Sequence, residues 1–359
     1  MKNKCTLIVD GNWLLISRLS MCKQSFDVNA SDEDKKLAKD ELCDIMTRTI
    51  NVTLCKLESA IDNVIFVADG YSWRKLLDKP SSRTDIAYKG NRQREVTLDW
   101  EAIFDAMKLE MESLASNNCT VTRCDNTEGD DLIYYWSKRL NSEGINTVIW
   151  STDNDLKQLI RHNDNDTFTA WYNDSNGLFL HNSYDTSSLD SIDFFMMYEN
   201  PSLTILKQSV HRVSYINPDE IVMAKIVCGD SSDNIKSLII QKRGNKNYRI
   251  TEKVWAQVQN ELGIRNTEEF YEHRDDIIKR LCEIKSVDYD AERDNITEIF
   301  DYNRQLVHLH EDSYPEYVKE QMKTIGEYKQ FDIDYIINNY KAIDISYEDN
   351  EIMETFLKI

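Results

Sequence analysis

Three short apolar segments of this chain each end on an aspartate, and this pattern constrains the fold more than any other feature. The segments occupy 5–10, 63–69 and 146–153 and end on Asp10, Asp69 and Asp153. Short apolar runs separated by helical stretches are typical of buried parallel strands. In an open α/β sheet, ligands bind beyond the carboxyl ends of the strands. The three aspartates are therefore predicted to converge on one crevice.

Further acidic motifs follow where such a crevice would be completed. Together they make nine carboxylates candidates for one metal site: Asp10, Asp69, Glu128, Asp130, Asp131, Asp153, Asp155, Asp230 and Asp233. Two carboxylates about 5 Å apart repel by roughly 3 kcal/mol at an effective dielectric of ~20, so a cluster of this size requires cations. Mg²⁺ or Mn²⁺ suits an all-carboxylate site with waters better than Zn²⁺, which prefers His and Cys.

Each acid also has a simpler interpretation. A single aspartate after a strand is usually a turn residue or a helix N-cap, and Thr127 with Asp130 fits a capping pair. Independent turn residues have no reason to recur after every predicted strand. The joint pattern therefore favours a shared metal site.

The remaining periodicity predicts an α/β chain with a mostly parallel, twisted central sheet and helices on both faces. Strands are expected at 4–10, 63–69, 119–124 and 146–151, with a hairpin over 165–182. Helices are expected across 11–60 and at 98–109, 129–141, 155–161 and 217–229. Beyond about 205 the strand signal disappears. We therefore predict two domains, 1–205 and a smaller all-helical region 206–359.

Composition adds the expected compartment. The eight cysteines show no Cys-x-x-Cys spacing and several lie in apolar patterns, as expected of reduced core residues. The six histidines form no convincing ligand pair, which disfavours zinc. No run of eighteen apolar residues occurs. A soluble, cytoplasmic monomer with no membrane partner is expected.

The formal net charge of −20 at first argues against a nucleic-acid partner, but its distribution favours one. Between 72 and 95, seven basic residues accompany three acidic ones, and between 236 and 253, six accompany one. Each stretch follows a predicted metal-ligand motif, where a phosphate-binding surface would be useful. The candidate DNA-binding residues are Arg74, Lys75, Lys79, Arg83, Tyr88, Lys236, Lys242, Arg243, Lys246 and Arg249. The alternative for either stretch is a solvated face of a surface helix.

The ordered motifs resemble those of the flap-endonuclease superfamily of structure-specific 5′ nucleases, and within it the branch of T-even bacteriophages, whose members are named RNase H. Their order and spacing match over roughly the first 240 residues. The motifs that carry the resemblance are Val9-Asp10-Gly11-Asn12, Ala68-Asp69-Gly70, Tyr88-Lys89-Gly90-Asn91-Arg92, Glu128-Gly129-Asp130-Asp131, Ser151-Thr152-Asp153-Asn154-Asp155-Leu156 and Gly229-Asp230-Ser231-Ser232-Asp233-Asn234-Ile235. Asp99-Trp100-Glu101 and Tyr302-Asn303-Arg304 resemble the phage branch in particular.

The resemblance implies a PIN-like, Rossmann-like catalytic domain, a helix-three-turn-helix-like DNA-binding motif in the second region, and a basic arch or bridge at 72–97. It implies two Mg²⁺ ions, which Mn²⁺ would replace, and products with a 5′-phosphate and a 3′-hydroxyl. Asp69 and Asp130 would bind the first ion, with Asp10 and Glu128 acting mostly through waters. The second ion would take Asp153, Asp155 and Asp230, with Asp131 and Asp233 supporting. Lys89 and Arg92 would stabilise the scissile phosphate.

The substrates implied are branched or 5′-ended DNA and RNA–DNA duplexes, as in primer removal and flap processing during replication, with a bacteriophage origin and a bacterial host cytoplasm. A sliding clamp and a single-stranded-DNA-binding protein are the expected protein partners. The apolar end of the tail at 350–359 fits docking on a clamp and fits a packed terminal helix equally well.

Three other classes remain as alternatives. An aspartyl phosphatase needs a second aspartate two residues after the first, where this chain has Asn12. A PIN-type endoribonuclease would not explain the second acidic motif with its basic helical region. A non-catalytic branched-DNA binder would have lost ligands that are all present. One departure from the superfamily is the basic sequence at 236–248, which replaces a glycine-rich hairpin that binds K⁺ in many relatives and so leaves a K⁺ site in question.

Overall fold

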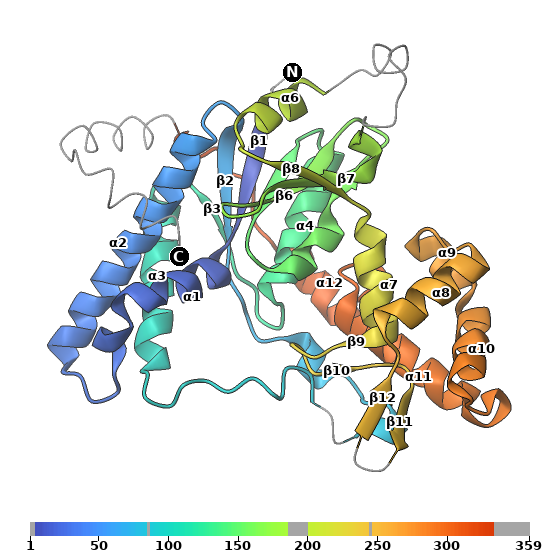
Figure 1. Ribbon diagram of the computed structural model, residues 1–359. Coiled ribbons are helices and arrows are strands. Elements are labelled where there is room, and N and C mark those ends of the chain that lie inside the picture. The colour runs from blue at the N-terminus through green and yellow to red at the C-terminus, as the bar shows by residue number, and fades with distance from the viewer. Residues whose placement is uncertain (1–3, 85–86, 186–199, 244–245, 334–359) are drawn as a thin grey trace. The chain divides into compact units, whose positions relative to one another are not determined.

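The computed structural model describes residues 4–84, 87–185, 200–243 and 246–333, and its largest element is an eight-stranded sheet (Figure 1). The strands are β1 Cys5–Asp10, β2 Ile61–Val67, β3 Thr120–Thr122, β4 Thr147–Trp150, β5 Arg161–His162, β6 Phe168–Asn173, β7 Gly177–His181 and β8 Val213–Ile216. Their order is β3-β2-β1-β4-β6-β7-β8, and β5 pairs with β6. Strands β3 to β6 along this path are parallel, whereas β7 is antiparallel to β6. The predicted fold class, with its mostly parallel sheet, is confirmed.

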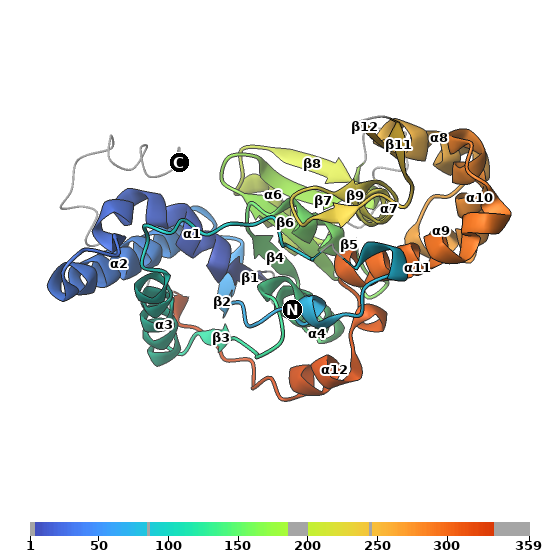
Figure 2. The ribbon, with the colours of Figure 1, turned by 90° about the horizontal axis from the view of Figure 1, so that it is seen from below.

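Central strand β1 shows why the sequence forms this sheet. All six residues of β1 are buried, as expected for a strand covered on both faces. Its odd-numbered side chains pack in a hydrophobic cluster with α1 Gly11–Cys22, α2 Asp32–Lys56 and α3 Trp100–Ser116. Helix α4 Gly129–Ser142 contacts β1, β2 and β4. Figure 2 shows α1 to α3 on one side of these strands and α4 on the other.

By its internal contacts the chain forms two compact units. The first contains residues up to Tyr71, Glu95–Ile216 and the segment from Glu320 onward, and the second contains Ser72–Arg94 and Asn217–Lys319. This division differs from the predicted boundary near 205. Strand β8 and helix α6 Pro201–Gln208 belong to the sheet unit, and the basic segment after Tyr71 packs within the second unit.

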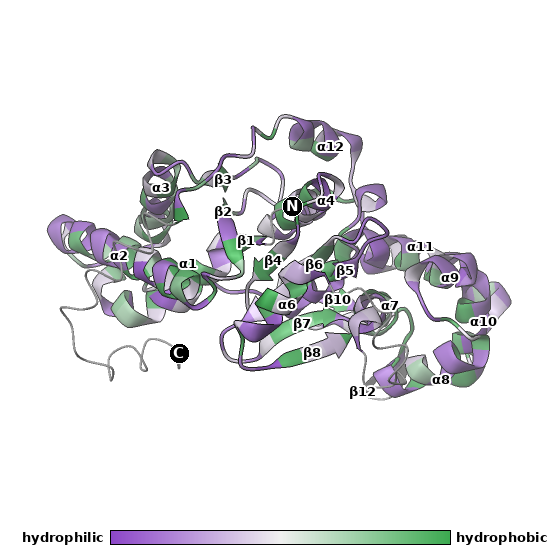
Figure 3. Cartoon of the chain, turned by 90° about the horizontal axis from the view of Figure 1, so that it is seen from above, coloured by the Kyte–Doolittle hydropathy of each residue, from purple (hydrophilic) through white to green (hydrophobic). Residues whose placement is uncertain are grey.

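The second unit is mostly helical. Its helices are α7 Pro218–Cys228, α8 Glu252–Leu262, α9 Thr267–Glu272, α10 Arg274–Lys285 and α11 Tyr289–Val307, followed by α12 Glu316–Lys323 at the boundary. They surround an aromatic core in which Phe270 and Phe300 stack at 5.1 Å. In Figure 3 the outward sides of α8 and α10 carry much of the purple of hydrophilic residues.

The expectation that strands end near 205 is wrong. Strand β8 of the sheet unit lies beyond this point, and the second unit contains two antiparallel pairs, β9 Gly229–Asp230 with β10 Ile235–Lys236 and β11 Ile240–Arg243 with β12 Lys246–Arg249. These strands are two to four residues long and lack an alternating apolar face, so a hydrophobic-period argument does not detect them. The prediction of an all-helical second region is corrected to a mostly helical one.

A returning segment at 326–333 crosses the sheet unit at the amino ends of its strands. The Asn63 side chain donates to Lys329 O at 2.8 Å and accepts from Phe331 N at 2.9 Å. Tyr328 Oη lies 2.6 Å from the Thr6 hydroxyl, and Lys329 N donates to Thr120 Oγ1. The segment thus satisfies polar groups at the edge opposite the carboxyl ends of the strands. The predicted tail at 350–359 lies outside the described residues.

Glu110 on α3 gives a pH-dependent stability prediction. It is 1% exposed, and burial raises its pKa to about 7 despite hydrogen bonds from the Thr47 hydroxyl. The pKa of Glu110 in the folded protein exceeds the ordinary value of a glutamate. The contribution of this carboxyl to the free energy of unfolding is therefore fully present below the ordinary pKa and is lost as pH rises to about 7. We expect Glu110→Gln to raise the free energy of unfolding by up to about 3 kcal/mol at pH 8 and far less at pH 5, as measured by urea denaturation.

The control for this prediction is Glu112→Gln, which changes an exposed glutamate on the same helix and should alter stability little at either pH. An equal gain from Glu110→Gln at both pH values would show that the charge of this carboxyl is not the cause.

Candidate active site at the carboxyl edge of the sheet

The three strand-end aspartates follow neighbouring strands. In the sheet β1 lies between β2 and β4, with Asp10 opposite Val67 and Val9 opposite Trp150. Asp69 comes two residues after β2, and Asp153 three residues after β4. The parallel strands therefore bring Asp69, Asp10 and Asp153 to one edge, as the sequence predicted.

Asp10 is the most buried of these three aspartates, at 8% exposure. Burial, and to a lesser extent the charges of Asp69 and Asp153, raise its pKa to about 7 against hydrogen bonds from Trp13 N and the Ser151 hydroxyl. The charges of both Asp69 and Asp153 thus act on the Asp10 carboxyl. The bond from Trp13 N also makes Asp10 the N-cap of α1, so the simpler capping interpretation holds together with the site interpretation.

Asp69 is held by two groups, Asn12 and Gly129, whose role the sequence alone does not show. The Asn12 amide donates to Asp69 Oδ2 at 2.8 Å, and Asp69 N donates back to Asn12 Oδ1 at 2.9 Å. The backbone N–H of Gly129 donates to Asp69 Oδ1 at 2.5 Å. A Cβ at Gly129 would lie 2.9 Å from that oxygen, which explains the glycine in the Glu-Gly-Asp-Asp motif.

The acids of that motif lie at the start of α4. Glu128 is 7% exposed, and its N–H donates to Asp131 Oδ2 at 3.0 Å. Asp131 is fully buried and closes the first turn of α4, where its side chain forms a capping box with that of Glu128. Asp130 is partly exposed in the same turn. Glu128, Asp130 and Asp131 all stay candidate ligands of this motif.

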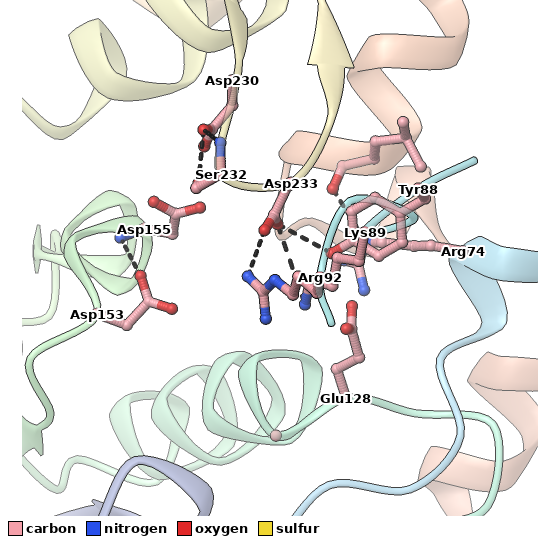
Figure 4. Close-up of polar contacts among 12 residues, drawn as sticks. Arg74, Tyr88, Lys89, Arg92, Glu128, Asp153, Asp155, Asp230, Ser232 and Asp233 are labelled. Atoms are coloured by element: carbon pink, nitrogen blue, oxygen red, sulfur yellow. Dashed lines mark hydrogen bonds and ion pairs between the residues drawn. The ribbon is translucent and has the colours of Figure 1, made fainter. Parts of the chain in front are cut away.

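Asp153 and Asp155 belong to the turn after β4. The side chain of Asp153 caps the short 3₁₀ helix Asn154–Leu159 by accepting from Asp155 N at 2.9 Å (Figure 4). Ser151 connects this turn to β1, because its hydroxyl donates to Asp10 Oδ2 at 2.7 Å and accepts from Asp153 N at 2.9 Å. Ser151 is therefore a further positioning group that sequence reasoning did not assign.

The acids of the sheet unit are near one another but are not grouped around one point. Among the residues that the structure describes, no set of three or more His, Cys, Asp or Glu side chains is arranged to hold a metal ion. The donor set itself fits hard divalent cations, which take carboxylate oxygens. The Asp10 carboxyl also experiences the negative charges of Asp69 and Asp153, which a bound cation would offset.

Asp230 and Asp233 lie in the second unit, in the turn between β9 and β10 and its flanks. Burial alone would raise the pKa of Asp230, but hydrogen bonds from Lys225 and Ser232 hold it below its usual value. The Lys225 ammonium lies 2.6 Å from Asp230 Oδ2. Asp233 is 7% exposed and pairs with Arg92.

The basic candidates differ in what their side chains contact. Arg74 is 2% exposed, donates to Leu306 O at 3.0 Å and stacks on Trp73, so its guanidinium has a structural role within this unit. Arg83 donates to the carbonyls of Ser237 and Leu238, and burial lowers its pKa to about 10, which makes it a structural residue as well. A count of charges along the sequence does not reveal this, because both guanidinium groups donate to backbone carbonyls that lie far away in the sequence.

The other candidates differ in exposure where the structure describes their side chains. Lys75, Lys79 and Arg249 are exposed, whereas Lys236 is half-buried and donates to Asn234 Oδ1 at 2.6 Å. Lys242, Arg243 and Lys246 belong to the β11–β12 hairpin, and Arg243 is opposite Lys246 in the register of the two strands. Tyr88 is 7% exposed and belongs to the core of the unit, so it anchors the basic segment and is not available to stack on a base.

Two further findings concern the whole described chain. All eight cysteines are free thiols, and Cys5, Cys22, Cys119, Cys228 and Cys282 are buried, as the sequence predicted for a reduced core. In the part of the chain that the structure describes, no helix has the length and apolar character needed to cross a membrane.

The chain matches no known protein-family model. It is 29% identical over 201 residues to a 5′-3′ exonuclease of Mycoplasmopsis pulmonis, a match that covers 55% of this chain and 54% of that protein. The chain therefore spans about half the length of this curated relative.

Solved structures resemble the chain over nearly all of its length. A T5 protein co-crystallised with metal ions superposes with a TM-score of 0.52 at 18% identity, covering 95% of this chain and 99% of the other. The T5 5′-exonuclease with bound zinc gives the same TM-score and coverage at 19% identity. At this identity the likeness shows a shared fold. The chain therefore shares the fold of the T5 5′-exonuclease.

Proposed function

We propose that the chain is a divalent-metal-dependent 5′ nuclease that hydrolyses phosphodiesters at the 5′ ends or flaps of branched DNA and RNA–DNA duplexes. The observation that supports this most strongly is the placement of Asp69, Asp10 and Asp153 beyond the carboxyl ends of three adjacent parallel strands. The likeness to a named 5′-3′ exonuclease supports the same reaction class.

Asp10, Asp69, Glu128, Asp130, Asp153 and Asp155 would hold Mg²⁺, or Mn²⁺ in its place, with Asp230, and Asp131 would support them. Bound divalent cations would lower the pKa of a coordinated water and offset charge on the phosphoryl oxygens. The chain's own groups orient these ligands: Asn12 and Gly129 N hold Asp69, and Ser151 holds Asp10. Lys89 and Arg92 would meet the charge that develops on the scissile phosphate.

The products of this reaction would be a 5′-phosphate and a 3′-hydroxyl. The proposal also includes a helix-three-turn-helix-like DNA-binding role for the second unit and primer removal in phage replication. The protein would act as a monomer in a host cytoplasm. Its protein partners would be a sliding clamp or a single-stranded-DNA-binding protein.

The experiment that tests the function compares two substrates in the presence and absence of Mg²⁺. A DNA flap labelled at its 5′ end should be cut only with Mg²⁺, and unstructured single-stranded RNA should be cut far more slowly. Preferred cleavage of the RNA would favour a PIN-type endoribonuclease. Tight binding of the flap without cleavage in either Mg²⁺ or Mn²⁺ would favour a non-catalytic branched-DNA binder.

The β11–β12 hairpin provides a test of duplex binding. We propose that its Lys242, Arg243 and Lys246 bind phosphates, which position a protein without reading sequence. Replacing all three with Gln should weaken binding to every duplex sequence similarly. The slope of log affinity against log salt should shrink by up to about three units, because each phosphate that the protein no longer neutralises reduces it by ~0.9.

The matched control replaces three exposed lysines of the sheet unit, Lys36, Lys108 and Lys138, and so removes the same net charge elsewhere. If both triple variants lower the slope equally, net charge and not the hairpin accounts for binding.

A further inference from the structure

Asp233 and the basic segment make a dense set of contacts within the second unit. Arg92 forms a short hydrogen bond and ion pair with Asp233 Oδ1. On the other carboxyl oxygen, the Tyr88 hydroxyl donates to Oδ2 at 3.3 Å and the Lys89 ammonium lies 4.0 Å away. Figure 4 shows Tyr88, Lys89 and Arg92 gathered around this one carboxylate.

Backbone contacts fasten the same two segments. Lys89 N donates to Asp233 O at 2.9 Å, and the Asn234 side chain donates to Ala87 O at 2.9 Å. The Asn91 side chain donates to Ser231 O at 2.8 Å. Each of the two segments, 87–92 and 231–234, therefore donates hydrogen bonds to the other.

Lys89 itself has an unusual conformation. Its φ is 54°, in the left-handed region that a lysine seldom adopts, and Asn234 opposite has a φ of 60°. Such conformations persist where the surrounding structure holds them, and they concentrate at functional sites. The fastening by Asp233 and Asn234 accounts for how Lys89 is kept in place.

The environment of Asp233 also contrasts with that of the strand-end aspartates. Asp10 faces the like charges of Asp69 and Asp153 and therefore gains from a cation. Asp233 already has a guanidinium on one oxygen and a hydroxyl with a nearby ammonium on the other. A divalent cation at Asp233 would have to displace the positively charged side chains of Arg92 and Lys89 or be repelled by them.

We propose that Asp233 is a positioning residue that sets the place of Lys89 and Arg92, and that it is not a metal ligand. This inference rests on the proposed nuclease function for its catalytic consequence, but the fastening itself is a property of the free protein. Asp233 thus connects the Gly-Asp-Ser-Ser-Asp-Asn motif to the side chains of Lys89 and Arg92, which would contact the scissile phosphate.

The first test requires no catalysis. In the free, metal-free protein, hydrogen exchange at 87–92 should accelerate by at least about tenfold in Asp233→Asn, because local opening becomes easier. Arg92→Gln should produce the same change, and it provides the readout if Asp233→Asn does not fold. Asp78→Asn, at an exposed acid of the same segment, should leave exchange unchanged. Unchanged exchange at 87–92 in both test variants would overturn the fastening.

The second test separates positioning from metal binding. In single-turnover flap cleavage, Asp233→Asn should keep the Mg²⁺ midpoint within about threefold of wild type, whereas Asp153→Asn should shift it by more than about tenfold. The double variant Asp233→Asn with Arg92→Gln should cleave within about threefold of the rate of the slower single variant. The reason is that each single change already removes the same ion pair.

Two outcomes of this second test would overturn the inference: a shifted Mg²⁺ midpoint for Asp233→Asn, or rate losses that multiply in the double variant. A wild-type protein that cleaves no flap would instead refute the proposed function. The exchange measurement would still decide whether Asp233 holds the segment.

Discussion

Asp69→Asn and Asp153→Asn are each expected to lower the rate of flap cleavage by roughly 10³-fold or more, because each removes a charge that would hold a divalent cation. Asn keeps one acceptor oxygen, so Asp69→Asn retains one of the two bonds that Asp69 accepts on different oxygens from Asn12 and Gly129. Folding and DNA affinity should therefore largely survive. The measurement is single-turnover cleavage in saturating Mg²⁺, together with thermal unfolding of each variant.

The control is Asp164→Asn, at an exposed aspartate before β6 that belongs to no predicted motif, and it should cleave at the wild-type rate. Near-normal turnover of either test variant would remove that aspartate from the site. The capping interpretation would then be sufficient for Asp153, whose side chain accepts from Asp155 N in any case.

The sheet and its acidic edge were predictable because one physical rule places both. Buried parallel strands need continuous apolar runs, and β1, β2 and β4 have them. The residue after each run then lies at a shared edge whatever the helices between the strands do. Asp10, Asp69 and Asp153 could therefore be brought together from spacing alone.

The supporting polar groups were less predictable. Asn12 and Ser151 were visible in the motifs, but only the hydrogen bonds to Asp69 and Asp10 show what they do. The role of Asp131 likewise depends on its burial, since a capping aspartate and a ligand have the same sequence signature. Local sequence does not distinguish a carboxylate that closes a helix turn from one that faces the crevice.

The basic residues show a different limit. A count of charges in 72–95 treats all seven alike, yet Arg74 is buried against Leu306 O and Arg83 is bound to two carbonyls. Their partners lie more than 150 positions away in the chain. Long-range interactions of this kind carry no periodic signal. Only the three-dimensional structure separates the arginines that build the segment from the cations left for substrate.

Lys89→Ala should reduce the single-turnover rate by roughly 10²-fold or more while changing substrate affinity by less than about tenfold. The Lys89 side chain is 17% exposed, and its ammonium lies 5.0 Å from the centre of the Tyr88 ring and 4.0 Å from Asp233. A cation held in this way requires little reorganisation when charge develops on a phosphate. Its contribution is therefore expected to be greater in the transition state than in the bound substrate.

Lys89→Met is the companion variant, since it keeps the aliphatic stem over Tyr88 and removes only the charge. It should lose as much rate as Lys89→Ala if the charge is responsible. Lys75→Ala is the better control than a change at Arg83, because Lys75 is exposed on the same segment whereas Arg83 supports Ser237 and Leu238. Lys75→Ala should weaken binding slightly and cleave at the wild-type rate. A Lys89→Ala enzyme that binds poorly but cleaves bound flap at the normal rate would limit this lysine to tethering phosphate, because a group that acts on developing charge must change the chemical step.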